Sequence, residues 1–180
     1  IISKYDQRIK IVDRANELCI PQTKVADFAK HIADVCKHDI VLWSHVTSPF
    51  VSTKDLNNAF DIFETEKKHD SVASVNKIQN FLWHKEDKRV VNNTNENRWP
   101  NTQDLFPLFE FNHAIYVCKK SLLKKGERVG DEPFLYECTG EATIDIDHEA
   151  DFVFAQRIST ISKNTCSLTD LYRDLGLLEM

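Results

Sequence analysis

The feature that most constrains the fold is an alternation of short apolar runs with segments of helical periodicity. Residues 40–43 (Ile-Val-Leu-Trp) form a continuous apolar run, which is typical of a strand buried on both faces. A helical stripe precedes it over about Thr23–Cys36, and a helix over about Thr53–Lys68 separates it from a strand at 71–75. This order indicates an α/β fold with a mainly parallel sheet and right-handed crossovers.

The same alternation continues after one interruption. From Asn76 to Pro107 the pattern breaks into short strands at 81–84 and 89–91 and an Asn-rich turn at 92–97. The other predicted elements are a strand end at 1–3, a helix through Ile9, Val12 and Ala15 or Asn16 with Asp6 as its N-cap, a Ser52–Asp55 capping box, strands at 114–117, 134–138 and 142–146, and helices near 121–125, 148–162 and 168–175.

The bulk properties are those of one ordinary domain over residues 1–180. A net charge of -5 argues against nonspecific nucleic-acid binding, which draws its affinity from Lys and Arg on phosphates. No apolar run approaches the ~20 residues of a membrane span, and the first residues lack a signal-peptide pattern. The five cysteines form no CxxC pair, which favours reduced thiols. We therefore expect a soluble, cytoplasmic protein without nucleic-acid or membrane partners.

Asp145 and Asp147 carry the sharpest chemical signal. In the predicted strand through Thr143-Ile144-Asp145-Ile146-Asp147, alternation places both carboxylates on one face, with Cα atoms about 7 Å apart. Such a pair can bind Mg²⁺, which takes its other ligands from water and substrate phosphates. A structural alternative stays open, in which Asp147 caps the following helix and Asp145 is a solvated strand end.

A second polar feature is the turn Thr47-Ser48-Pro49 after the apolar run at 40–43. Ligands of open α/β sheets bind beyond the carboxyl ends of strands, so these hydroxyls can contact a substrate. They can equally satisfy amides of the turn itself. His45 likewise has two interpretations, as a structural histidine or as a catalytic base.

Other chemistries lack their motifs in this sequence. The four glycines belong to no GxGxxG or GxxxxGK[ST] pattern, no Cys/His spacing indicates zinc, and no GxSxG is present. The amides of Gln103 and Asn112 can hydrogen-bond a sugar, although single amides are common in loops.

Five short tags occur in a distinctive order. They are Thr47-Ser48-Pro49, residues 70–75 (Asp-Ser-Val-Ala-Ser-Val), 99–105 (Trp-Pro-Asn-Thr-Gln-Asp-Leu), 111–116 (Phe-Asn-His-Ala-Ile-Tyr), and 144–147 (Ile-Asp-Ile-Asp) with Asp151-Phe152. In order and spacing, from about Ile40 to Ile158, the chain resembles the acylneuraminate cytidylyltransferase family, which includes the CMP-sialic acid synthetases.

The resemblance implies a Rossmann-like nucleotide-diphospho-sugar transferase fold and a cytidylyltransferase activity. The anomeric hydroxyl of a 2-keto acidic sugar, such as a sialic acid, attacks the α-phosphate of CTP and releases pyrophosphate. It implies that Asp145 and Asp147 are catalytic and bind Mg²⁺. The substrate-binding residues that it implies are His45, Thr47, Ser48, Gln103 and Asn112.

The resemblance also implies a homodimer. The segment 77–107, called the excursion below, would cross to the partner and border its active site. Its departure from the α/β rhythm would then have a functional reason.

Several positions depart from the family. Its N-terminal phosphate-binding stretch, rich in Gly, Arg, Ser and Lys, has no counterpart here, and little room remains between Ile20 and Pro21 for its Arg- and Asp-containing loop. His45 stands where many members have Gln, and His113 replaces a usual Gly. These changes bear on the identity of the sugar.

One departure removes a charge. Asn101 or Thr102 stands where an Arg is common, and neither can pair a carboxylate bidentately as Arg does. The nearby Arg98 is a candidate to compensate. An alternative function is therefore a catalytically degenerate member that acts as a binding or assembly subunit, and a third is a nucleotidyltransferase for a different sugar. An N-terminal Gly/Arg/Ser/Lys loop in the full gene would favour the enzyme.

Overall fold

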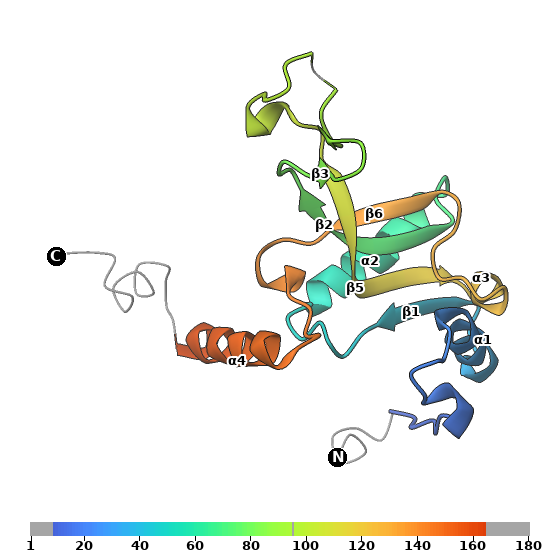
Figure 1. Cartoon of the computed structure of the whole chain (residues 1–180). Coiled ribbons are helices and arrows are strands. Elements are labelled where there is room, and N and C mark those ends of the chain that lie inside the picture. The colour runs from blue at the N-terminus through green and yellow to red at the C-terminus, as the bar shows by residue number, and fades with distance from the viewer. Residues whose placement is uncertain (1–8, 95, 165–180) are drawn as a thin grey trace.

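A computed structural model describes residues 9–94 and 96–164. In this part of the chain a four-stranded sheet has the order β1-β5-β2-β6. Its strands are β1 (Ile40–Ser44), β2 (Ser71–Ile78), β5 (Leu108–Lys119) and β6 (Pro133–Glu137), and the helices are α1 (Val25–Val35), α2 (Thr53–Thr65), α3 (Lys120–Lys124) and α4 (Glu149–Asn164). Figure 1 shows α4 extending away from the sheet.

The predicted α/β class is confirmed. Strand β2 pairs parallel with β6, whereas β5 runs antiparallel to both β1 and β2. Three of these four strands therefore point in one direction, and the long β5 between β1 and β2 points in the other. Of the helices in the described ranges, none is both long and apolar enough to cross a membrane.

Helices cover both faces of the sheet. Ala59 and Phe63 of α2 pack in one cluster with Val117 of β5, while Ala29 and Ala33 of α1 pack in another with its neighbour Cys118. Because successive strand residues point to opposite faces, α2 and α1 lie on opposite sides of the sheet. The apolar runs of the sequence are thus covered on both faces of the sheet, as their lack of polar and apolar alternation predicted.

The capping box of α2 is confirmed. The Ser52 hydroxyl accepts the Asp55 N–H at 3.2 Å, and the Asp55 carboxylate accepts the Ser52 N–H at 3.0 Å. Each partner satisfies an N–H that the helix itself leaves unpaired. The cap fixes where the chain turns from the Thr47-Ser48-Pro49 turn into α2.

Strand β5 contains a wide bulge opposite β2. Ala73 pairs with Tyr116, but Val75, two residues on, pairs with Phe111, five residues away. Within the extra residues His113 adopts φ 62°, a left-handed conformation that costs most side chains about 1–2 kcal/mol. This geometry explains why glycine suits the position in the resembling family.

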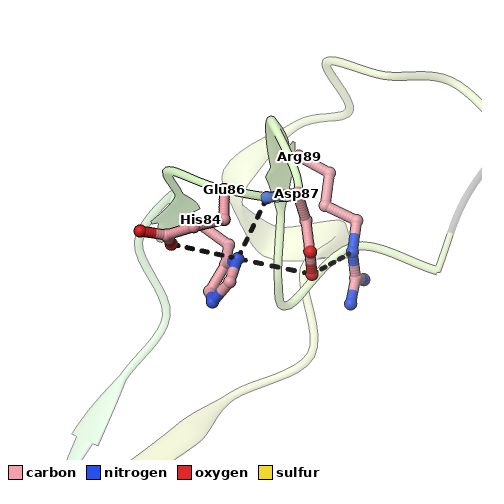
Figure 2. A network of polar contacts seen from close by, with 4 residues as sticks. All are labelled: His84, Glu86, Asp87 and Arg89. Atoms are coloured by element: carbon pink, nitrogen blue, oxygen red, sulfur yellow. Dashed lines mark hydrogen bonds and ion pairs between the residues drawn. The ribbon is translucent and has the colours of Figure 1, made fainter.

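The excursion leaves the sheet between β2 and β5 and projects beyond it (Figure 1). It contains the two-stranded hairpin of β3 (Trp83–His84) and β4 (Arg89–Val90), and the 3-10 turn η3 (Thr102–Asp104). At the hairpin tip Asp87 joins two side chains: its carboxylate accepts from Arg89 Nε at 3.4 Å, and its N–H donates to His84 Nδ1 at 3.2 Å (Figure 2). The strands predicted at 81–84 and 89–91 are present but shorter.

Two predicted elements are wrong. Residues 9–15 form no helix, and only the 3-10 turn η2 (Asn16–Leu18) follows. The apolar side chains of Ile9, Ile11 and Val12 are exposed there, and a short helix needs a packed apolar face to be stable. The predicted strand end at 1–3, the cap Asp6 and the helix at 168–175 lie outside the described residues.

The strand predicted at 142–146 is also absent. A 3-10 turn, η4 (Gly140–Thr143), and an irregular segment replace it. The chain leaves the sheet after β6, which ends at Glu137, and turns at Gly140, whose φ is 59°. Beyond this turn Asn76 Nδ2 donates to the Thr143 carbonyl, and the Ile146 N–H donates to the Thr47 carbonyl. The alternation argument for Asp145 and Asp147 therefore fails, because neither is in a strand.

The bulge gives a test of the left-handed residue. We predict that His113→Gly is more stable than His113→Ala by about 1 kcal/mol, because both variants lose the imidazole and only alanine keeps a Cβ at φ 62°. Chemical denaturation of the two variants measures the difference. At a position with negative φ, the alanine variant is the more stable of the two. A His113→Ala variant that is more stable than His113→Gly would therefore contradict the bulge geometry.

Candidate functional site

An aromatic and cationic cluster lies where β1 ends. Trp43 lies in β1 and His45 directly follows it, while His113 and Tyr116 come from β5 and Arg128 from the connection between α3 and β6. The Trp43 and His45 rings stack with centroids 5.3 Å apart and an interplanar angle of 13°. We call these five residues the Arg128 cluster.

Strand pairing brings the cluster together. Trp43 is the register partner of Tyr116 in the antiparallel β1–β5 pair. The bulge then turns His113 so that its Nδ1 lies 2.6 Å from the Tyr116 hydroxyl, and the His45 and His113 rings are 6.0 Å apart. Two segments about 70 residues apart in sequence thus supply one surface.

Arg128 closes the cluster. Its guanidinium carbon lies 4.4 Å from the centre of the Tyr116 ring and 5.4 Å from that of Trp43. Nη1 lies 3.4 Å from Nε2 of His45, and Nη2 lies 3.2 Å from Nδ1 of His113. Guanidinium groups only donate hydrogen bonds, so both imidazole nitrogens act as acceptors and carry no proton in this arrangement.

The electrostatics keep His45 neutral. Burial lowers the pKa of His45, the positive charge of Arg128 and the nearby His113 lower it further, and the carboxylate of Asp145 partly opposes them. With Nε2 facing Arg128, neutral His45 carries its proton on Nδ1 and presents a donor there. Burial also raises the pKa of Tyr116, which keeps its hydroxyl protonated at neutral pH.

The turn Thr47-Ser48-Pro49 meets the segment that carries the two aspartates. The Ile146 N–H donates to the Thr47 carbonyl at 2.9 Å, and Asp145 influences the pKa values of both His45 and Tyr116. The structure thus brings His45, Thr47 and Asp145 to one place. Asp145 is far in sequence from His45 and Thr47, and one backbone hydrogen bond, from the Ile146 N–H to the Thr47 carbonyl, joins the two segments.

Ser48 is unusual within this turn. Its side chain is 5% exposed, and in the described part of the chain its hydroxyl has no hydrogen-bond partner. A buried hydroxyl without a partner costs roughly 1–3 kcal/mol, so such groups commonly occur where a ligand or water completes them.

Asp147 is exposed and lies at the start of α4. The Asp151 carboxylate accepts the N–H groups of both Asp147 and His148, at 3.2 and 2.9 Å. The predicted helix cap is therefore made by Asp151. Asp145 Oδ1 accepts the Ile146 N–H at 3.1 Å, and among the described residues no group of three or more His, Cys, Asp or Glu side chains could hold a metal.

Asn112 is buried and fully engaged by its neighbours. Its Oδ1 accepts from the Ser74 hydroxyl at 2.5 Å and from the Ala114 N–H, and its Nδ2 donates to Asn76 Oδ1 at 2.8 Å. Ser74 in turn accepts the Ile115 N–H at 2.8 Å. These bonds span the bulge, so the position of His113 depends on Asn112.

Gln103 lies apart from the other predicted residues, on η3 of the excursion. Its carbonyl accepts from Gln79 Nε2 at 3.2 Å, and its own side chain is exposed. Arg98 is in the excursion too, 5.6 Å from the ring centres of both Trp83 and Trp99.

A groove adjoins the turn on its other side. Its volume is about 890 Å³, and it runs between Pro49 and Phe50 and the face of α4 that carries Phe152 and Ala155. Its lining is mostly apolar and includes Ile146.

The sequence did not predict Trp43, Tyr116 and Arg128 as site residues. The two aromatics look like core residues of strands, and Arg128 stands alone in a charged connection. Only the strand register and the bulge reveal the cluster. A weak signal was present in the tag at 111–116, which already contained His113 and Tyr116.

Asp70 anchors the segment that carries Arg128. Its Oδ2 accepts the N–H groups of Asp131 and Glu132 at 2.8 and 3.2 Å, and Ser71 accepts the Gly130 N–H at 2.9 Å. A Cβ on Gly130 would lie 2.2 Å from the Asp70 carboxylate, so only glycine allows this approach. Although burial opposes ionisation, these N–H donors and the Ser71 hydroxyl lower the pKa of Asp70.

The anchor predicts a pH-dependent difference in stability. A carboxyl with a lowered pKa in the folded state stabilises the protein above its unfolded pKa, 3.8, and loses this contribution as the pH falls through the folded value. We expect Asp70→Asn to be less stable than wild type at pH 7 by about 0.5–1 kcal/mol, because the site is exposed. In urea titrations the difference should shrink below about pH 4. A difference that is constant with pH would contradict the anchor.

Comparison with known proteins gives a partial answer. No protein-family model matches the chain. Over 138 residues, 74% of the chain, it is 28% identical to the N-acylneuraminate cytidylyltransferase A of Danio rerio, and the match covers 31% of that protein. The crystal structure of 4-diphosphocytidyl-2C-methyl-D-erythritol synthase from Anaerococcus prevotii has a TM-score of 0.55 at 16% identity, with 88% of this chain and 74% of that chain covered. The chain is therefore cytidylyltransferase-like in sequence and has the Rossmann-like α/β fold of a nucleotidyltransferase.

Proposed function

We propose that this protein is a cytidylyltransferase that transfers CMP from CTP to the anomeric hydroxyl of a 2-keto acidic sugar of the sialic acid type, releasing pyrophosphate. The observation that carries the proposal is the hydrogen bond from Ile146 to the Thr47 carbonyl, which joins the two tags at the end of β1. The relation to the Danio rerio protein supports the same activity. The match covers a minority of that protein, so its whole activity is carried over here as a proposal.

The proposed sugar contacts come from the turn after β1. Ser48 has a buried hydroxyl without a partner in the described part of the chain, and a substrate hydroxyl would complete its hydrogen bonds. Thr47, the preceding residue, would supply a second hydroxyl. Neutral His45 offers its Nδ1–H to a sugar oxygen. Asn112 acts through the bulge that it holds, and Gln103 would act from the excursion.

The aspartates suit Mg²⁺ by the chemistry of their donors. Mg²⁺ in phosphoryl-transfer sites uses one or two carboxylates and completes its octahedron with water and substrate phosphates, so a cluster of three protein ligands is not needed. Asp145 and Asp147 would hold the ion. In the described structure Asp145 receives one hydrogen bond, from Ile146, through Oδ1. Bound Mg²⁺ would supply neutralisation of phosphate charge.

The chain's own residues would position the reaction. The turn would orient the sugar so that its anomeric hydroxyl faces the α-phosphate, since positioning and electrostatics account for most of the catalysis of such displacements. The apolar groove beside the turn would exclude water from one side of the sugar. A degenerate binding subunit remains the alternative outcome of the assay below.

The reaction is tested with the complete gene product, CTP, Mg²⁺ and a panel of 2-keto sugar acids, with pyrophosphate release as the readout. We expect release with one sugar acid. Asp145→Asn and Asp147→Asn should each reduce turnover at least about 100-fold with little loss of stability, because a metal ligand is lost from a half-exposed or exposed site. Asp151→Asn is the matched control, since it removes a carboxylate one turn away that serves as a helix cap.

The outcomes separate the alternatives. If the folded protein releases no pyrophosphate with any of the sugar acids, the result favours the binding subunit. Release that is unchanged in both aspartate variants would overturn the metal assignment and leave the reaction standing. Use of another nucleoside triphosphate in place of CTP would point to a different nucleotidyltransferase.

We also propose a homodimer formed through the excursion. Phe81, Trp83 and Trp99 form an exposed aromatic cluster there. The Trp83 and Trp99 rings stack with centroids 6.3 Å apart, and the Phe81 ring is tilted against that of Trp99 with centroids 5.8 Å apart. Exposed aromatic clusters of this kind are enriched in protein interfaces.

Light scattering at micromolar concentration should therefore give the mass of a dimer. Trp83→Ala together with Trp99→Ala should shift the protein to monomer. Ile11→Ser is the control, because Ile11 and Trp99 are each 58% exposed and only Trp99 belongs to the aromatic cluster. A monomeric wild type would contradict the proposal.

A further inference from the structure

Arg128 has no acidic partner in the described part of the chain, where no carboxylate forms an ion pair with it. Its guanidinium is half-buried between two aromatic faces and two imidazoles. A cation placed in this way is usually paired, because burial removes part of its hydration. The arrangement therefore favours an anion from outside the chain.

Arg128 has further N–H donors with which to bind such an anion. Arginine has five N–H donors in a planar fork, and the imidazoles of His45 and His113 accept from two of its nitrogens. The Tyr116 and Trp43 rings, 4.4 and 5.4 Å from the guanidinium carbon, hold the fork in place. The remaining donors match the two oxygens of a carboxylate.

The location indicates which anion it is. The cluster includes His45, two residues before Thr47, and so lies on the proposed sugar side of the site. Arg98, the other candidate arginine, stacks on Trp83 and Trp99 in the excursion.

We propose that Arg128, fixed by the Tyr116 and Trp43 rings and by His45 and His113, binds the carboxylate of the acidic sugar. This inference rests on the proposed function and adds a specificity residue to it. Asp70 and Gly130 act as positioning residues, because they fix the backbone two residues from Arg128. We assign the bound anion to the carboxylate of the sugar. The competing assignment is a phosphate group of CTP, which would pair with the same guanidinium.

The test measures the KM for the sugar acid and the KM for CTP separately in the pyrophosphate assay. Arg128→Gln should raise the KM for the sugar acid about 10- to 100-fold, the usual effect of losing a charged hydrogen-bonding partner, and change that for CTP less than about twofold. Arg128→Lys keeps the charge but not the fork, so its effect should be intermediate. Wild type should prefer the free acid to its neutral methyl ester, and Arg128→Gln should lose most of this preference.

Two other arginines serve as comparisons. Arg14→Gln is the matched control, since Arg14 also stacks on an aromatic ring, Phe28, 4.1 Å away, and should behave as wild type. Arg98→Gln tests the competing arginine. A sugar KM raised by Arg98→Gln and unchanged by Arg128→Gln would overturn the inference.

The remaining outcomes also decide. An active wild type with an unchanged sugar KM in both Arg128 variants would overturn the inference and leave the proposed function intact. A raised KM for CTP alone would reassign Arg128 to phosphate and overturn it as well. If wild type releases no pyrophosphate with any sugar acid, the proposed function fails and the inference falls with it.

Discussion

The bulge in β5 is the constraint on which the site depends. A regular antiparallel strand would alternate its side chains between the two faces of the sheet, whereas the extra residues opposite β2 turn His113 toward Tyr116. The amide of Asn112 stabilises this departure through Ser74 and Asn76. A polar network in the middle of a sheet thus has a role that apolar residues could not fill.

The second determinant is electrostatic. Burial and the positive charge of Arg128 together lower the pKa of His45, which keeps His45 neutral beside the guanidinium. Asp145 moderates this effect from the segment tied to the Thr47 turn. The site is consequently polarised, with a cationic part where β1 ends, beside the bulge of β5, and a carboxylate-bearing part before α4.

Much of the fold could be predicted from the sequence, because the apolar runs at 40–43 and 71–75 and the stripe of α1 are local signals of burial and periodicity. The capping box at Ser52 was predictable for the same reason. The helix proposed through Ile9 was wrong because periodicity alone does not provide a packing partner. The strand through Asp145 was wrong because its pattern could not show that the chain leaves the sheet after Glu137 and turns at Gly140.

The site was only partly predictable, since it depends on register. His45 and Thr47 could be named from their place after a strand. Arg128 could not, because its approach to Tyr116 requires both the β1–β5 pairing and the anchored loop. Local sequence patterns identify residues whose role follows from their neighbours in the chain. They do not identify residues that only tertiary contacts bring together.

The anchor at Asp70 has a consequence for how the site forms. The hydrogen bonds of Asp70 to Asp131 and Glu132, and that of the neighbouring Ser71 to Gly130, span 59 to 62 residues and exist only when β6 lies beside β2. Contacts so distant in sequence form after the loop between them has closed, so the site assembles late in folding. Unfolded or partly folded chains then lack it altogether. A ligand of the Arg128 cluster would bind the native state alone and protect the whole domain against unfolding.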